Sequence, residues 1–176
     1  VLVVKNLRQF DDQGVERLKG ISLNLKAGEI LGIAGVAGNG QSELLEVLGG
    51  YANATGEITL KGNSLPLSGS GANGRIRRES GIGHVPEDRQ QEGLIMDFMA
   101  WENMAFGYHH APEYQNGMLM DNAAIQKEAL AKMERFDVRP PNPKLNAKNF
   151  SGGNQQKIVV AREIENNPDV LLIGQP

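Results

Sequence analysis

Cysteine is absent from the 176-residue sequence, which excludes disulfides, thiolate metal sites and cysteine nucleophiles together. Aromatic residues make up only 5% of it, and no apolar run approaches the roughly 18 residues that a membrane-spanning helix needs. Positive charge is also not in excess: 18 Lys and Arg against 21 Asp and Glu give a net charge of -3, which predicts no basic face of the kind that nucleic acid requires. The first five residues lack the basic-then-apolar layout of a secretory signal. These absences predict a chain that neither crosses a membrane nor binds nucleic acid.

Glycine is the abundant residue, at 22 positions. Apolar residues make up 40% of the chain and charged residues 22%, enough to bury one core and too apolar for a disordered chain. Because glycine is used where the backbone turns with positive φ or approaches another group closely, the glycine-rich segments are the first candidates for a binding site.

The first half of the chain has the pattern of strands. Residues 1–4 form a β-branched run, and residues 21–25 alternate between apolar and polar side chains, the period of a half-buried strand. Residues 30–34 are apolar on both faces, which predicts a strand buried inside a parallel sheet. Residues 56–60 and 82–85 are two further short strands.

The second half is predicted to be largely helical. Helical spacing occurs over residues 42–48, 101–106, 121–136 and 151–165. The last of these helices is expected to turn Ile158, Ala161 and Ile164 inward. A strand follows over residues 170–173, while residues 67–74 have the composition of a flexible loop. The order predicts an α/β sheet that carries a helical insertion.

A glycine-rich turn over residues 35–42 follows the predicted buried strand and opens a helix. Successive backbone N–H groups and the helix N-terminus suit a phosphate chain. The candidate nucleotide-binding residues are Gly35, Val36, Ala37, Gly38, Asn39, Gly40, Gln41 and Ser42. The Ser42 hydroxyl is placed to bind Mg²⁺, but Gln41 stands where the strict phosphate-loop pattern has lysine. A generic strand-to-helix turn is the alternative interpretation.

A second glycine turn, FSGGNQQK over residues 150–157, also opens a helix. Taken alone it indicates only an N-cap with glycines in the first helical turn. Downstream of a phosphate loop, however, it closely resembles the signature motif of ABC transporter ATPases. The signature residues by this resemblance are Ser151, Gly152, Gly153, Asn154 and Gln155, and they would contact the ATP held by a partner.

The resemblance extends along the chain. GHVPEDRQQEGL, residues 83–94, is similar to the Q-loop region of the second nucleotide-binding half of bacterial sugar or nucleoside importer ATPases, which carry two ABC halves in tandem. LLIGQP at residues 171–176 stands where that family has its Walker B strand. The resemblance implies a P-loop NTPase fold with an N-terminal antiparallel β subdomain and an inserted helical subdomain, incomplete at the C-terminus after the Walker B strand.

Several positions depart from the family pattern. Gly174 and Gln175 stand where the Walker B aspartate and the catalytic glutamate are usual, and Glu87 stands where the Q-loop glutamine is usual. Glu87 is therefore a possible Mg²⁺ or water ligand beside Ser42, and a solvated loop carboxylate is its alternative interpretation. Since hydrolysis needs the lysine and a carboxylate that positions water, this half is expected to bind ATP but hydrolyse it poorly, and the isolated chain to be inactive.

Phe10 is the nearest aromatic residue upstream of the phosphate loop and is a candidate to stack on adenine, with a plain surface or core role as the alternative. The predicted organisation is an ATP-binding core over residues 1–86, a helical subdomain over 87–150, and a returning signature helix and Walker B strand over 151–176.

The resemblance also implies partners: the N-terminal ABC half of the same polypeptide, membrane permease subunits and, indirectly, a solute-binding protein. The expected location is the cytoplasmic face of the bacterial membrane, with ATP and Mg²⁺ as cofactors. The sequence does not identify the solute. An independent P-loop kinase or GTPase is disfavoured by the missing lysine and carboxylates, whereas an interaction module that binds no nucleotide remains an alternative.

Overall fold

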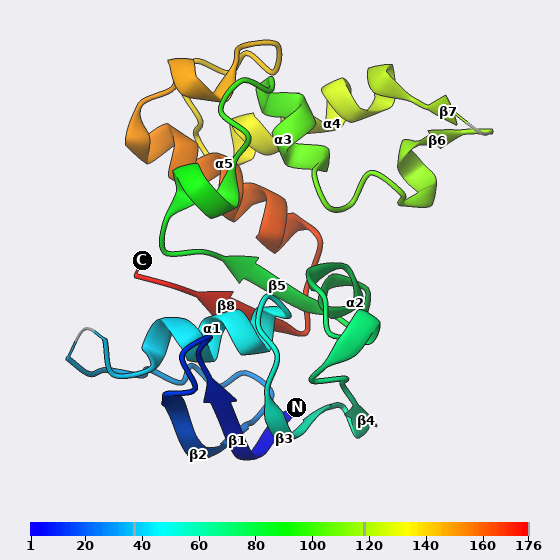
Figure 1. Ribbon diagram of the computed structural model, residues 1–176. Helices are drawn as coiled ribbons and strands as arrows, with labels where there is room; N and C mark the ends of the chain where they lie inside the picture. The colour runs from blue at the N-terminus through cyan, green and yellow to red at the C-terminus, as the bar shows by residue number, and fades with distance from the viewer. Residues whose placement is uncertain (37, 118, 176) are drawn as a thin grey trace. The chain divides into compact units, whose positions relative to one another are not determined.

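The computed structural model describes residues 1–36, 38–117 and 119–175. The described residues fold into two compact units: unit 1 lies within residues 1–84 and 168–174, and unit 2 lies within residues 85–167 and includes Gln175. Figure 1 shows the course of the chain, with the elements labelled.

Unit 1 is built on a four-stranded antiparallel sheet with strand order β2-β1-β3-β4 (Figure 1). The strands are β1 Leu2–Phe10, β2 Glu16–Leu25, β3 Thr55–Leu60 and β4 Asn63–Ser64. Leu2 and Val4 of β1 lie opposite Leu60 and Ile58 of β3, which places four buried apolar side chains on one face of the sheet. The predicted N-terminal antiparallel subdomain is therefore confirmed.

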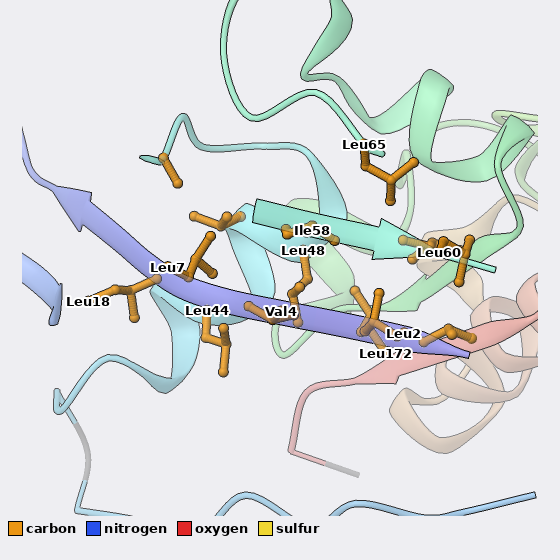
Figure 2. Packing of buried hydrophobic residues seen from close by; sticks show 14 residues of the cluster. Leu2, Val4, Leu7, Leu18, Leu44, Leu48, Ile58, Leu60, Leu65 and Leu172 are labelled. Carbon is orange, nitrogen blue, oxygen red and sulfur yellow. The ribbon is translucent and has the colours of Figure 1, made fainter. Parts of the chain in front are cut away.

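One helix supplies the other side of this core. Helix α1, Gln41–Gly49, turns Leu44 and Leu48 toward the inner face of the sheet, and Leu172 packs in the same cluster (Figure 2). The helix ends at Gly50, whose positive φ of 81° and two backbone bonds to Glu46 and Val47 form a left-handed C-cap. The helix and its glycine stop agree with the sequence pattern.

The buried strand predicted over residues 30–34 does not form. The segment has no strand assignment, and Ile30 and Ile33 are 97% and 54% exposed. A strand needs a neighbour to bind its N–H and C=O groups. Among the described residues, β5 and β8 form a sheet of two strands only, so this apolar run has no strand to pair with and lies in solvent.

Three other elements complete unit 1. Strand β8, Val170–Ile173, pairs with β5, Ile82–Val85, as the sequence predicted for both. The predicted loop over residues 67–74 instead leads into helix α2, Gly74–Glu79, because the Asn73 side chain accepts a bond from the Ile76 N–H and caps it.

Unit 2 is mainly helical. It contains α3 Ala100–Ala105, α4 Asn122–Arg135 and α5 Gly152–Glu165, together with a π-helical turn at Arg89–Gly93 and the two-residue strands β6 Gln115–Asn116 and β7 Leu119–Met120. Helices α3, α4 and α5 pack against one another, which confirms the inserted helical subdomain.

Helix α5 buries two of the three side chains that the sequence predicted to face inward. Ile158 and Ala161 are fully buried, but Ile164 is 42% exposed. Arg162 and Glu163 are buried in its place, at 2% and 0% exposure. The apolar spacing was right for Ile158 and Ala161 and wrong for Ile164, because the buried positions beside it hold two charged side chains that pair with each other.

Candidate functional site

The glycine turn that precedes α1 has left-handed backbone at two of its glycines. Gly38 and Gly40 have φ values of 82° and 99°, which side-chain-bearing residues rarely adopt. A Cβ on Gly40 would lie 3.1 Å from the carbonyl oxygen of Arg17, whereas no described atom lies within 4 Å of the Cβ position at Gly38. Gly40 is the N-cap of α1, so the loop ends at the N-terminus of this helix, where the first backbone N–H groups have no carbonyl acceptor within the helix.

Gln41 folds back onto this loop. Its Nε2 atom donates to the Val36 carbonyl oxygen at 3.2 Å, and a Cβ on Gly35 would collide with the same atom. A side chain at position 35 would therefore displace the Gln41 amide, which stands in the place of lysine, from its present position. The amide is neutral and already bonded, so it supplies no positive charge to a bound phosphate.

The other loop candidates lie at the surface. Gly35, Val36, Asn39 and Ser42 are exposed, while Ala37 lies outside the described residues. Ser42 is the second residue of α1, and it is exposed. A polyphosphate could therefore reach the N–H groups without displacing the core.

The second glycine turn begins α5, with Ser151 as the N-cap. The first intrahelical bond runs from the Gln155 N–H to the Ser151 carbonyl at 2.9 Å, so the N–H groups of the preceding residues have no acceptor within the helix. Asn154 is held on both sides: its Nδ2 donates to Ser151 Oγ, and its Oδ1 accepts from the Arg139 N–H.

The two glycines of this turn differ in surroundings. A Cβ on Gly152 would lie 2.6 Å from Arg89 Nη2, whereas no described atom lies within 4 Å of the Cβ position at Gly153. Gly153 is exposed and faces open space, so it is the glycine of the pair that an incoming ligand could approach.

A salt-bridge network lies at the C-terminal side of the same turn. The Lys157 and Arg139 side chains both pair with Asp137, at 3.2 and 2.7 Å. Hydrogen bonds from these two cations lower the pKa of the exposed Asp137 carboxyl below its usual value. The sequence patterns did not point to this network, because its members are scattered along the chain.

The catalytic carboxylates expected of a hydrolase are missing from the end of β8. Gly174, which follows the strand, is buried, and Gln175 is exposed with a positive φ of 38°. Glu87 is partly buried on the loop before the π-helical turn. No group of three or more His, Cys, Asp or Glu side chains suited to a metal ion occurs in the described part of the chain.

Phe10 lies at the end of β1 and is 54% exposed, so it is available for stacking. Within residues 1–36, 38–117 and 119–175, no helix combines the length and apolar character needed to cross a bilayer.

Sequence comparison places these features in a known family. The family model described as ABC transporter matches residues 18–176. The guanosine import ATP-binding protein NupO of Bacillus subtilis is 40% identical across the whole chain, which covers 34% of that protein. The nucleoside import ATP-binding protein NupA of Lactococcus lactis is 39% identical, again across the whole chain and 34% of the relative. A ribose import ATP-binding protein RbsA of Clostridium perfringens is 36% identical over 92% of the chain and 31% of its own length. The chain thus spans about a third of the length of these curated relatives.

Structural comparison agrees. The ATP-binding cassette MJ0796, in a dimeric post-hydrolysis state bound to ADP and Pi, superposes with a TM-score of 0.79 at 27% identity, covering 98% of this chain and 73% of that one. The cassette cbiO1 of Clostridium perfringens has the same fold, with a TM-score of 0.71 over 98% of this chain and 64% of its own. The chain therefore belongs to the ABC transporter family and has the P-loop fold of an ATP-binding cassette.

Proposed function

We propose that this chain is the nucleotide-binding part of the second half of a tandem ABC importer ATPase, which energises uptake of a sugar or a nucleoside. The observation that carries the proposal is the pair of glycine turns, each at the start of a helix. In the first turn the Gln41 side chain donates to the Val36 carbonyl of the same loop, and in the second turn Gly153 faces open space. Relatives named for guanosine, nucleoside and ribose import support the importer class.

The loop over residues 35–42 binds ATP but does not hydrolyse it efficiently. Backbone N–H groups and the α1 N-terminus hold the phosphates. A hydrogen bond to a charged group contributes roughly 1.5–3 kcal/mol, so replacing lysine by Gln41 weakens binding by about ten- to a hundredfold. Gly174 and Gln175 offer no carboxylate to position water, and an electrostatic contact of that kind contributes about 3–4 kcal/mol to the transition state.

Mg²⁺ would be bound by the Ser42 hydroxyl, with Glu87 as the second candidate ligand. The exposed Ser42 fits this role, since a hydroxyl at the end of a phosphate loop can share a cation with the phosphates. The ion would neutralise phosphate charge at this site. Phe10 would stack on the adenine ring.

The turn at Ser151 and Gly153 serves the opposite nucleotide site. The free N–H groups and positive dipole end of α5 suit the terminal phosphate of ATP held by a partner. Function is then asymmetric: this half completes a competent site on its tandem partner and retains nucleotide at its own loop.

The partners that follow are the N-terminal ABC half of the same polypeptide, membrane permease subunits and, through them, a solute-binding protein. The complex would place this chain at the cytoplasmic face of the membrane. The division into a core over residues 1–86, a helical subdomain over 87–150 and a returning segment over 151–176 belongs to the same proposal.

A second candidate is an interaction module that binds no nucleotide, and the bond from Gln41 to Val36 favours it because that bond closes the loop on itself. Binding of a fluorescent ATP analogue, measured with and without Mg²⁺, separates the two. The proposal expects saturable, Mg²⁺-strengthened binding that Ser42→Ala weakens, with essentially no turnover. Absence of binding at millimolar analogue would favour the interaction module.

A further inference from the structure

Residues 89–93 are tied to the start of α5 by a chain of side-chain hydrogen bonds within unit 2. Gln90 Nε2 donates to Gln155 Oε1 at 3.1 Å. Gln155 is 3% exposed, and its own Nε2 donates to the carbonyl oxygens of Ala147 and Phe150 at 3.1 and 3.2 Å. Because an amide has its donor and acceptor on opposite sides, the bond from Gln90 fixes the orientation in which Gln155 Nε2 faces these carbonyls.

The position of those carbonyls matters for the signature turn. Phe150 directly precedes Ser151, the N-cap of α5, so Gln155 holds the backbone that leads into the turn. Gln90 therefore acts on the path of the chain at Ser151 through Gln155, without touching the glycines.

Two further contacts come from the same segment. The Arg89 guanidinium lies over Gly152, so closely that a Cβ there would be 2.6 Å from Nη2. Arg89 Nε is buried without a hydrogen-bond partner among the described residues. At the other end of the segment, the buried Arg162 side chain donates to the Gly93 carbonyl at 2.9 Å. The segment is thus attached to α5 near both of its ends.

We infer that Gln90 and Arg89 are positioning residues, which hold the backbone of the signature turn at Ser151 and Gly152. The π-helical turn begins two residues after Glu87, and Asp88 caps it by accepting from the N–H groups of Gln90 and Gln91. These contacts connect the loop at Glu87 to the turn at Ser151 within unit 2. This inference rests on the proposed role of that turn in the partner's nucleotide site.

The test compares two adjacent, exposed glutamines in the complete transporter. Gln90→Ala removes the donor to Gln155, and Gln90→Glu keeps the shape while also removing the donor. Gln91→Ala is the matched control, because only its backbone N–H is bonded to Asp88. We expect both Gln90 variants to lower kcat for ATP hydrolysis by about two- to tenfold, the range for one hydrogen bond, with KM and melting temperature unchanged. Gln91→Ala should match the wild type.

A double-mutant cycle tests the Arg89 contact. Gly152→Ala should lower kcat because its methyl group displaces the guanidinium, and the same change should cost less in an Arg89→Ala background. Additive effects of the two substitutions would overturn the assignment of Arg89.

Gly153→Asp separates the inference from the proposed function. If Gly153→Asp abolishes hydrolysis while Gln90→Ala equals Gln91→Ala, the positioning role is wrong and the proposed function stands. If Gln90→Ala lowers the ATPase rate only in proportion to a smaller amount of folded protein, the positioning role is also wrong. If Gly153→Asp has no effect on ATP hydrolysis, the proposed role of the turn is wrong, and the positioning role that rests on it is wrong with it.

Discussion

The buried Arg162–Glu163 pair gives the sharpest stability prediction. Arg162 Nε donates to Glu163 Oε1 at 2.8 Å, and its Nη1 donates to the carbonyls of Gly93 and Asn103 at 2.9 and 3.2 Å. The two side chains are 2% and 0% exposed. Arg162→Met keeps most of the apolar volume but leaves the Glu163 carboxylate buried without its cation. Removing one partner of a buried pair costs about 3–5 kcal/mol, a large part of a typical stability of about 5–15 kcal/mol.

The assay is equilibrium urea unfolding followed by fluorescence of Trp101, the single tryptophan of the chain, which lies in α3. With a slope of about 1–3 kcal/mol per molar urea, the midpoint should fall by at least about 1 M. Arg135→Met is the matched control: Arg135 pairs with Glu165 at 3.0 Å, but its side chain is 71% exposed, so the change should cost less than about 1 kcal/mol.

The double variant Arg162→Met with Glu163→Gln should recover part of the loss, since no uncompensated charge remains and the new amide can still accept the bond from Tyr108. Equal midpoints for Arg162→Met and Arg135→Met would refute the reasoning, as would a double variant less stable than the single one.

Three further predictions concern binding, association and acid stability. Gln41→Lys should tighten ATP-analogue binding by about ten- to a hundredfold without conferring hydrolysis, measured by titration and phosphate release; turnover from this single change would contradict the role assigned to the end of β8. The exposed apolar side chains of Ile30 and Ile33 should make the chain self-associate, so the double change to Asp should shift sedimentation toward the monomer, and a wild-type monomer at high concentration would contradict this. The hydrogen bond and charge of Lys148 lower the pKa of the exposed Asp97 carboxyl, so this pair stabilises the fold above about pH 4 and ceases to do so as the pH falls through the folded-state pKa. Lys148→Met should therefore lower stability at pH 6 more than at pH 2, and equal losses at both would contradict it.

Local patterns predicted the parts of the fold that depend on local chemistry. The alternation over residues 21–25 marked part of β2, and the glycine pair Gly49-Gly50 marked the end of α1, with its left-handed cap at Gly50. The order of strands and helices predicted an α/β sheet, and the resemblance of the two glycine turns to family motifs implied the cassette fold. These signals reside in a few neighbouring residues, so a single sequence carries them.

The rest depends on contacts between distant residues. Apolar content alone predicted a buried strand over residues 30–34, but burial requires a neighbouring strand, and none of the described strands pairs with it. Ile164 was expected inside because periodicity counts apolar residues, whereas the pairing of Arg162 and Glu163 buries two charges instead. The same limit applies to Arg89, whose approach to Gly152 depends on the packing of residues far apart in the sequence.

The central claim, that this half serves its partner's nucleotide through the signature turn while its own loop is catalytically weak, is tested most directly by two substitutions in the assembled transporter. Gly153→Asp meets no described atom within 4 Å of its Cβ position, so it should not disturb packing, but it places a carboxylate beside the expected phosphate. Gln41→Ala removes only a neutral amide bonded to Val36. ATPase rate and solute uptake should be nearly abolished by Gly153→Asp and reduced only mildly by Gln41→Ala. A tolerated Gly153→Asp together with an inactive Gln41→Ala would reverse the asymmetry and contradict the account.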